Sequence, residues 1–286
     1  MKGHAERGLI VAMLLAGATT AAGGDALRAR EFYRRAEYQA AIDTMLPLES
    51  KTPDSLALLG QAYYGNGEYK QATIYLEKAI AASPSNALYY DWLGKAYGWR
   101  AETSSVLTAP FYASKTRESF EKAVALDPVN LEALGDVFEY YLEAPRPLGG
   151  GMDKAEAIAV RIGRLDAAEF ECKLAALAEK RKQFDAAEQH LRRAVAMKPD
   201  QVGRMIDLGE FLARRGRYDE CEDLLRAAGN RNPGSPSLMF AQASLEIRRG
   251  RNLAEAQRLL RSYLASPITP DDPPRLEALR LFKMVP

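Results

Sequence analysis

The apolar residues between positions 54 and 84 recur at the spacing of a helix. They lie three or four residues apart, first before residue 65 and again after residue 67, and therefore share one helix face in each half. The Gly-Asn-Gly sequence at 65–67 interrupts the pattern and supplies turn conformations, and Pro84 ends the second helix. The stretch predicts a helical hairpin with the apolar faces Leu56, Leu59, Gly60 and Tyr63, and Ala72, Leu76, Ala79 and Ile80.

Copies of this hairpin follow along the chain. Second helices end alike, in YLEKAIAASP, SFEKAVALDP, HLRRAVAMKP and LLRAAGNRNP, and first helices share a Leu-Gly pair, as at Gly94 and Gly209. A lone hairpin cannot bury two apolar faces, so neighbouring copies must stack to cover them. Pro273 begins a last helix. Before it, seven units can be laid out, at 25–52, 53–86, 87–130, 131–167, 168–201, 202–236 and 237–270.

These units resemble the tetratricopeptide-repeat (TPR) family, which places Leu-Gly, Tyr, Ala and Pro at fixed positions in about 34 residues. The resemblance covers residues 25–266. It implies an all-α fold, namely a right-handed α-solenoid of about seven TPR-like helical hairpins at 25–270 with a C-terminal capping helix and tail at 271–286. It also implies a non-catalytic scaffold that binds protein or peptide, although such a fold names no partner. Residues 110–157 resemble a stretch of exported bacterial TPR proteins.

The first 22 residues have the pattern of a secretory signal peptide. Lys2 and Arg7 flank the start of an apolar core from Leu9 to Ala18, and small residues follow where a signal peptidase would cut. An uncleaved membrane anchor is the alternative, but this apolar run is shorter than the roughly 20 residues of a spanning helix. We therefore expect a periplasmic or secreted protein with no integral membrane segment after cleavage.

The charge of the chain argues against a nucleic-acid partner. Lysine and arginine number 39 against 38 aspartate and glutamate, which gives a net charge of +1. Cleavage of the leader would remove Lys2, Arg7 and Glu6 and leave no net charge. A basic surface that could hold nucleic acid or an anionic membrane is therefore not expected.

Motifs of catalysis and metal binding are missing from the sequence. It contains no GxSxG, HExxH, P-loop, GxGxxG or CxxC pattern. His190 is the only histidine after the leader and has no obvious nucleophile as a partner, so we expect no catalytic residue, no metal and no cofactor. Cys172 and Cys221 fall on helices that are not direct neighbours in such a stack, which predicts two free thiols.

Two consecutive units carry insertions at the same place, between their two helices. The first, at 100–115, is apolar, and the second, at 144–154, has a glycine run between two cations. The glycines either present backbone N–H groups to an anion or only make a tight turn. Equivalent turns lie side by side in a repeat stack, so we expect the two loops to form one binding patch. Its residues are Leu107, Phe111, Tyr112, Arg146, Gly149, Gly150, Gly151 and Lys154.

The concave groove of the stack is the other candidate surface. First-helix positions that line such a groove include Asp91, Trp99 and Glu139, and they are acidic toward the middle of the chain. Trp99 falls toward either the groove or the first inserted loop, whereas Trp92 is expected in the helix core. The Lys/Asn set with which some family members clamp a C-terminal carboxylate is not matched.

These patterns together predict a protein- or peptide-binding scaffold of the cell envelope. Binding would use the concave groove, the two inserted loops, or both. The alternative is a protein that binds a small ligand, a glycan or an anion at the two inserted loops. The identity of the partner does not follow from any motif.

Overall fold

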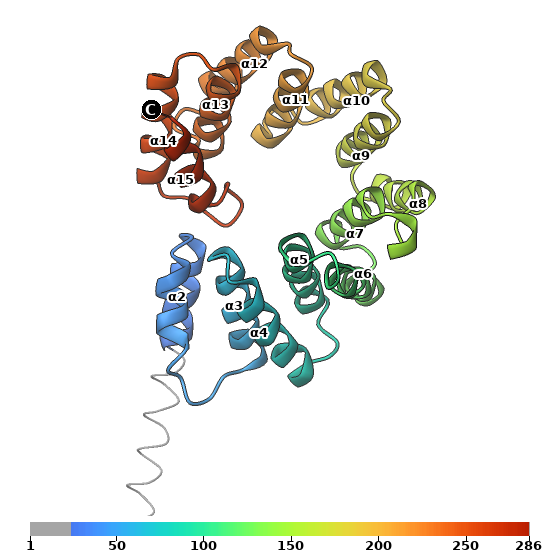
Figure 1. Ribbon diagram of the computed structural model, residues 1–286, viewed down its shortest axis with the longest axis vertical. Coiled ribbons are helices and arrows are strands. Elements are labelled where there is room, and N and C mark those ends of the chain that lie inside the picture. The colour runs from blue at the N-terminus through green and yellow to red at the C-terminus, as the bar shows by residue number, and fades with distance from the viewer. Residues whose placement is uncertain (1–23, 286) are drawn as a thin grey trace, which may run out of the picture. The chain divides into compact units, whose positions relative to one another are not determined.

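The computed structural model describes residues 24–285, which form helices joined by short connections and contain no β-strand (Figure 1). The predicted leader at 1–22 lies outside these residues. None of the described helices is long and apolar enough to span a bilayer. After a helix at 24–34, the elements are α2 (Tyr38–Met45), α3 (Pro53–Gly65), α4 (Tyr69–Ala82), α5 (Ala87–Thr103), α6 (Ala109–Leu126), α7 (Leu131–Glu143), η1 (Arg146–Leu148), α8 (Met152–Gly163), α9 (Ala167–Lys180), α10 (Phe184–Met197), α11 (Val202–Arg214), α12 (Tyr218–Arg231), α13 (Pro236–Arg249), α14 (Leu253–Ala265) and α15 (Arg275–Met284).

The helices pack in sequential pairs, which confirms the predicted all-α fold of helical hairpins. From α3 onward, each odd-numbered helix packs against the even-numbered helix that follows it, up to α13 with α14, and α15 packs on α14 and α13. Ahead of them, Ala29 of the helix at 24–34 shares a hydrophobic core with Ala41 of α2. The described residues therefore contain seven hairpins followed by one further helix.

The chain divides into two compact units, with the boundary between Leu126 and Asp127. The first unit contains α2 to α6 and the second contains α7 to α15. Each unit is described by itself below. Sequence reasoning did not anticipate this division, because the repeat pattern runs through the boundary without a break.

Side-chain caps fix the start of most first helices. Their oxygens accept hydrogen bonds from backbone N–H groups two or three residues further on, at positions that have no partner inside the helix. The start of a hairpin is therefore encoded by a few local residues. The capping residues are Thr52 for α3, Asn86 for α5, Asn130 for α7, Asp166 for α9 and Ser235 for α13.

In five of the seven repeats the two helices of a hairpin are joined by a connection of three residues that contains a left-handed residue. Such a residue reverses the chain within three positions, and only glycine adopts it without steric cost. The residues and their φ angles are Ala36 (51°), Gly67 (79°), Lys182 (60°), Gly216 (75°) and Gly250 (63°). The third and fourth repeats, which carry the insertions, connect their helices differently.

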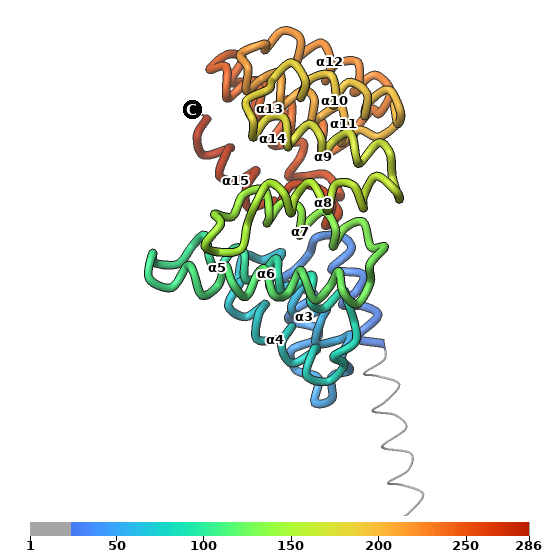
Figure 2. Tube along the Cα trace, turned by 90° about the vertical axis from the view of Figure 1, so that its right-hand side faces the viewer, coloured from blue at the N-terminus to red at the C-terminus, as the bar shows by residue number. Residues whose placement is uncertain are grey.

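The third repeat extends its helices instead of forming the long loop expected at 100–115. Helix α5 has 17 residues and α6 has 18, against 13 in α3 and 14 in α4, and only residues 104–108 lie outside both helices. Four additional residues lengthen a helix by about 6 Å. In Figure 2, the blue-green end of this hairpin projects beyond α3 and α4. The insertion is therefore a rigid helical extension with a short tip.

Candidate protein-binding surface

The projecting end of α5 and α6 exposes apolar side chains. The exposed fraction is 89% for Val106, 92% for Leu107 and 59% for Phe111. The first two lie in the 104–108 connection and Phe111 lies in the first turn of α6. Sequence reasoning named Leu107 and Phe111 but missed Val106, although Val106 stands directly before Leu107. We call these three residues the apolar tip.

Tyr112 supports the apolar tip from inside. Its ring stacks on that of Tyr97 with 6.0 Å between centroids, and Phe111 meets it edge to face at 5.3 Å. Arg100 Nη2 donates a hydrogen bond to the Tyr112 hydroxyl at 2.5 Å. Tyr112 is therefore half-buried and ties α6 to α5, unlike its neighbour Phe111.

Trp99 turns toward the preceding repeat. Its ring stacks on Tyr69, the first residue of α4, with 5.3 Å between centroids and 4° between planes. Its indole N–H donates to the hydroxyl of Tyr64 on α3 at 3.0 Å. Trp92 packs on the same Tyr64, edge to face at 5.3 Å. These contacts direct Trp99 toward α3 and α4 of the preceding repeat and leave 40% of the residue exposed.

Arg100 lies in a surface hollow beside these aromatic residues. Its Nη1 donates to Thr73 Oγ1 at 2.8 Å, and its guanidinium lies 4.1 Å from the centroid of the Tyr112 ring. No carboxylate of the described residues pairs with Arg100. The hollow has a volume of about 460 Å³ and is lined by Gly67, Glu68, Tyr69, Lys70, Gln71, Arg100, Thr103, Ser104 and Tyr112.

The second unit repeats this arrangement twice, but there the arginine binds a carboxylate. In all three cases an aromatic residue begins the second helix of a repeat, and an arginine of the next repeat bonds to the side chain four positions after that aromatic residue. Arg100 lies within α5, Arg249 ends α13 and Arg217 directly precedes α12. Arg217 pairs with Glu188, and Arg249 Nη1 bonds to Glu222 at 2.7 Å. The sets are Tyr69, Thr73 and Arg100, then Phe184, Glu188 and Arg217, then Tyr218, Glu222 and Arg249.

A hollow also lies at the Glu188–Arg217 pair of the second unit. It has a volume of about 700 Å³, and the guanidinium of Arg215 covers the Phe184 ring at 3.7 Å from its centroid. Because Glu188 already neutralises Arg217, this hollow has a carboxylate in place. The two hollows therefore differ in the direct partner of the arginine, which is a carboxylate for Arg217 and two hydroxyl groups for Arg100.

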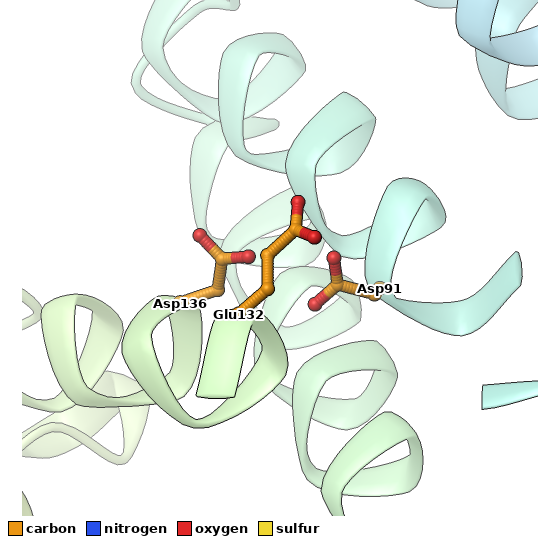
Figure 3. Close-up of side chains that lie close together, drawn as sticks. All are labelled: Asp91, Glu132 and Asp136. Atoms are coloured by element: carbon orange, nitrogen blue, oxygen red, sulfur yellow. The ribbon is translucent and has the colours of Figure 1, made fainter. Parts of the chain in front are cut away.

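Asp91, one of the predicted groove residues, is buried in the first unit. Its carboxylate pairs with Lys95 at 3.0 Å, and the Lys95 ammonium lies 4.7 Å from the centroid of the Trp92 ring. Figure 3 shows Asp91 on α5, and Glu132 and Asp136 one turn apart on α7. Asp91 is therefore buried and paired with a cation of its own helix.

Glu139, the other predicted groove acid, belongs to a series of ion pairs between successive first helices of the second unit. It binds Lys173 of α9 at 3.1 Å, and Lys173 also approaches Glu169 at 3.4 Å. Lys180 joins the same two helices by binding Glu143 at 2.8 Å, and Arg214 of α11 repeats the link one step further on by binding Glu179 of α9 at 2.9 Å. These groove charges brace one repeat against the next.

The glycine run at 149–151 makes a tight turn in the second unit. Its three backbone N–H groups donate to carbonyl oxygens of Arg146, Pro145 and Tyr141. Gly149 is left-handed, and a side chain on Gly150 would collide with the Ala144 carbonyl. Lys154 folds back to bond Gly149 O at 2.8 Å. These N–H groups are therefore engaged within the turn, which favours the tight-turn interpretation over anion binding.

The inserted segments lie in different units, so their union into one patch stays a prediction. Trp99, Leu107, Phe111 and Tyr112 lie on the α5–α6 hairpin of the first unit, with Asp91 two turns earlier on α5. The second unit contains Glu139 on α7, Arg146 in η1 and Lys154 on α8. The structure thus gathers four predicted residues at the apolar tip and its base.

His190 contacts a carboxylate of a neighbouring helix, and the two cysteines are free thiols. His190 Nδ1 lies 2.7 Å from a carboxylate oxygen of Glu171, which also accepts from Arg193. Cys172 and Cys221 are free, which confirms that prediction. Burial raises the pKa of each thiol to about 11. Both thiols are therefore protonated at neutral pH, unlike a nucleophilic cysteine.

Comparisons with known proteins agree with the repeat architecture. Family profiles described as Tetratricopeptide repeat match residues 53–86 and 176–245. The TPR repeat-containing protein PA4667 of Pseudomonas aeruginosa is 37% identical over 89 residues, which span 31% of this chain and 15% of that protein. The chain therefore covers only a small part of that relative.

Two solved structures show the same fold at low sequence identity. A tetratricopeptide repeat protein from Parabacteroides merdae superimposes with a TM-score of 0.58 at 12% identity, covering 93% of this chain and 99% of that one. The thermophilic TPR protein TTC0263 of Thermus thermophilus gives a TM-score of 0.56 at 19% identity, covering 68% of this chain and 100% of that one.

Proposed function

The chain belongs to the tetratricopeptide-repeat family, and on that premise we propose that it is a non-catalytic scaffold of the cell envelope whose α5–α6 end binds a protein partner. The observation that carries this proposal is the apolar tip. Val106, Leu107 and Phe111 stand on a helical extension that the repeat core does not need for its own burial. Clustered exposed apolar side chains of this kind mark sites of protein association.

The neighbouring residues suit such an interface. Trp99 is partly exposed at the same edge, and tryptophan and arginine are enriched where partners bind most strongly. The stacked Tyr97 and Tyr112 rings and Arg100 support Phe111 at the base of the tip, which lowers the entropy lost on binding. The groove acids Asp91 and Glu139 already have cationic partners within their own units. The contacts therefore favour the tip over the groove.

The alternative of an anion or glycan site at the two insertions has less support. It depended on free backbone N–H groups at Gly149, Gly150 and Gly151, and these groups donate to carbonyls of the same turn. Lys154 also bonds a carbonyl of that turn. A protein partner at the tip needs neither feature.

The test compares capture of partners by the full chain and by a variant of the tip. Leu107→Ser with Phe111→Ser removes two exposed apolar side chains, so the melting temperature should stay unchanged. Loss of a central apolar contact weakens binding by about tenfold or more, and recovery of the partner from envelope extract should fall accordingly. Val160→Ser with Met197→Ser changes two exposed apolar residues of the second unit and serves as the matched control. Equal recovery with the wild-type chain and the tip variant would rule out the tip.

The cell-envelope location rests on the signal-peptide pattern at residues 1–22. If the leader is cleaved as proposed, N-terminal sequencing of the exported protein should begin between Thr19 and Asp25. Soluble cytoplasmic protein that retains Met1 would contradict export.

A further inference from the structure

We infer that Arg100 binds a carboxylate side chain of the partner, so that the partner segment is acidic next to an apolar residue. This inference rests on the proposed function, because it assigns the chemistry of the partner at the same surface. The inference is based on an arrangement that occurs three times in the described residues. In each case there is an aromatic residue, a hydrogen-bond acceptor four positions later and an arginine from the following repeat. Two arginines of this kind hold a carboxylate, and Arg100 holds two hydroxyl groups.

The replaced acceptor explains why Arg100 retains an unneutralised charge. Glu188 and Glu222 occupy the acceptor position in the second unit, and Thr73 occupies it in the first. A threonine hydroxyl accepts a hydrogen bond but carries no charge. The guanidinium is always protonated and binds a carboxylate more strongly than a hydroxyl group. The first unit therefore has the cation of the pair without its anion.

Arg100 is also positioned and accessible for such a ligand. Its Nη1 and Nη2 are held by Thr73 and Tyr112, and the ring of Tyr112 lies under the guanidinium at 4.1 Å. Part of the side chain faces the hollow of about 460 Å³, which is ample for one carboxylate side chain. Glu68 lines the same hollow but accepts a hydrogen bond from Asn66 at 2.7 Å, and Lys70 adds a second positive charge.

The apolar tip adjoins this cation through Tyr112. The Tyr112 hydroxyl contacts Arg100, and its ring contacts Phe111 at 5.3 Å between centroids. A partner segment that places a carboxylate in the hollow therefore brings its neighbouring residues to Phe111. The recognised feature is an Asp or Glu side chain inside a segment, flanked by at least one apolar residue.

The first experiment selects peptides on the immobilised full chain from a display library of random 12-residue segments. The segments are followed by the display protein, so their C-terminal carboxylate is not free. We expect Asp or Glu next to an apolar residue to be enriched over the unselected library. The same selection on Arg100→Gln should lose the acidic preference. A set of wild-type binders without acidic enrichment would overturn the inference, and failure to select any binder would overturn both proposals.

The second experiment measures one selected peptide, acetylated and amidated, by calorimetry. Arg100→Gln and replacement of the peptide Glu by Gln should each weaken binding by about tenfold, and the two changes together should add little to either alone. Equal binding by the wild-type chain and Arg100→Gln would refute the inference. If Leu107→Ser with Phe111→Ser still abolished that binding, the proposed function would stand while the carboxylate contact fell.

A substitution at the acceptor position supplies the matched control. Thr73→Glu recreates the Glu188–Arg217 pair inside the first unit, so Arg100 should be neutralised and peptide binding should weaken about tenfold. Thr73→Gln has nearly the same size and an acceptor oxygen but no charge, and it should bind the peptide within about twofold of the wild-type chain. If both variants lost binding equally while keeping the wild-type melting temperature, the effect would be steric and the charge argument would fail.

Discussion

Gly94 lets α5 approach α6 closely, and Gly94→Ala should therefore destabilise the first unit. A Cβ atom built on Gly94 would lie 2.5 Å from Cε1 of the buried Phe120 ring. Carbon atoms of folded proteins prefer separations of about 3.5–4.0 Å. The Phe120 ring or the whole of α6 must therefore move by about 1 Å to admit one methyl group.

Gly98, one turn later on α5, supplies the control for this change. A Cβ atom there would lie 3.8 Å from Thr116 Cγ2, which is an ordinary contact. Alanine in place of glycine inside a helix gains about 1 kcal/mol in both variants. Overpacking a core costs about 1–3 kcal/mol, and the rigid Phe120 ring places Gly94→Ala at the upper end. We expect a net loss of about 2 kcal/mol at Gly94 and a gain of about 1 kcal/mol at Gly98.

Tryptophan fluorescence during thermal unfolding is the appropriate assay. The chain has two tryptophans, Trp92 and Trp99, and both lie on α5, so the signal reports the first unit. At roughly 2–4 °C per kcal/mol, the melting temperature should fall by about 4–8 °C in Gly94→Ala and rise by about 2–4 °C in Gly98→Ala. A Gly94→Ala protein that melts with the wild type, or above it, would show that α5 does not pack on α6 in this register.

Three further outcomes are expected. Lys182→Gly should stabilise the second unit by up to about 1 kcal/mol because glycine removes the cost of a left-handed residue. Gly216→Ala should cost about 1 kcal/mol because alanine is strained at that left-handed φ, although no atom would contact its Cβ. Urea unfolding distinguishes the two variants, and equal stabilities would contradict these turn conformations. Asp166→Ala should lower the free energy of unfolding by about 1 kcal/mol through loss of the α9 cap, and Asp166→Asn by less. The hydrogen bond from Lys198 holds the pKa of Asp166 below its ordinary value. This carboxylate therefore stabilises the fold above about pH 4, and its contribution is lost as the pH falls through the lowered pKa. An Asp166→Asn variant whose stability is as acid-sensitive as that of the wild type would contradict that account. Both cysteine thiols should react slowly with iodoacetamide in the native protein and fully in denaturant without reductant, and a mass two units low that reductant restores would reveal a disulfide.

Local sequence signals predicted the hairpins correctly. The helical spacing of Leu56, Leu59 and Tyr63, and the proline at 84, depend on interactions within a few residues. The same holds for a cap such as Asp166, whose carboxylate bonds to the next two or three backbone N–H groups. The free thiols followed from the expected order of helices in the stack. Such features need only local chemistry or the topology of the repeat.

The candidate site was only partly predictable, because its contacts cross between repeats. Residues 100–115 contain Ser-Ser and a proline and were interpreted as a loop, yet most of them extend α5 and α6. The partners of Arg100 are Thr73, 27 residues earlier, and Tyr112, 12 residues later. Glu139 has its cationic partner, Lys173, one repeat away. Sequence spacing alone does not reveal these pairs.

The departures of the third repeat from the rules of the others all occur at one place. It has no left-handed turn residue, its helices are longer by about one turn, and Arg100 lacks the carboxylate that Arg217 and Arg249 hold. The last of these departures leaves a charge uncompensated, whereas Arg217 and Arg249 of the second unit are each paired with a carboxylate. Local violations of a consistent pattern are expected at functional sites. The coincidence of an exposed apolar tip with an unneutralised arginine therefore argues for selection of a binding surface at the end of α5 and α6, since packing of the repeat explains neither.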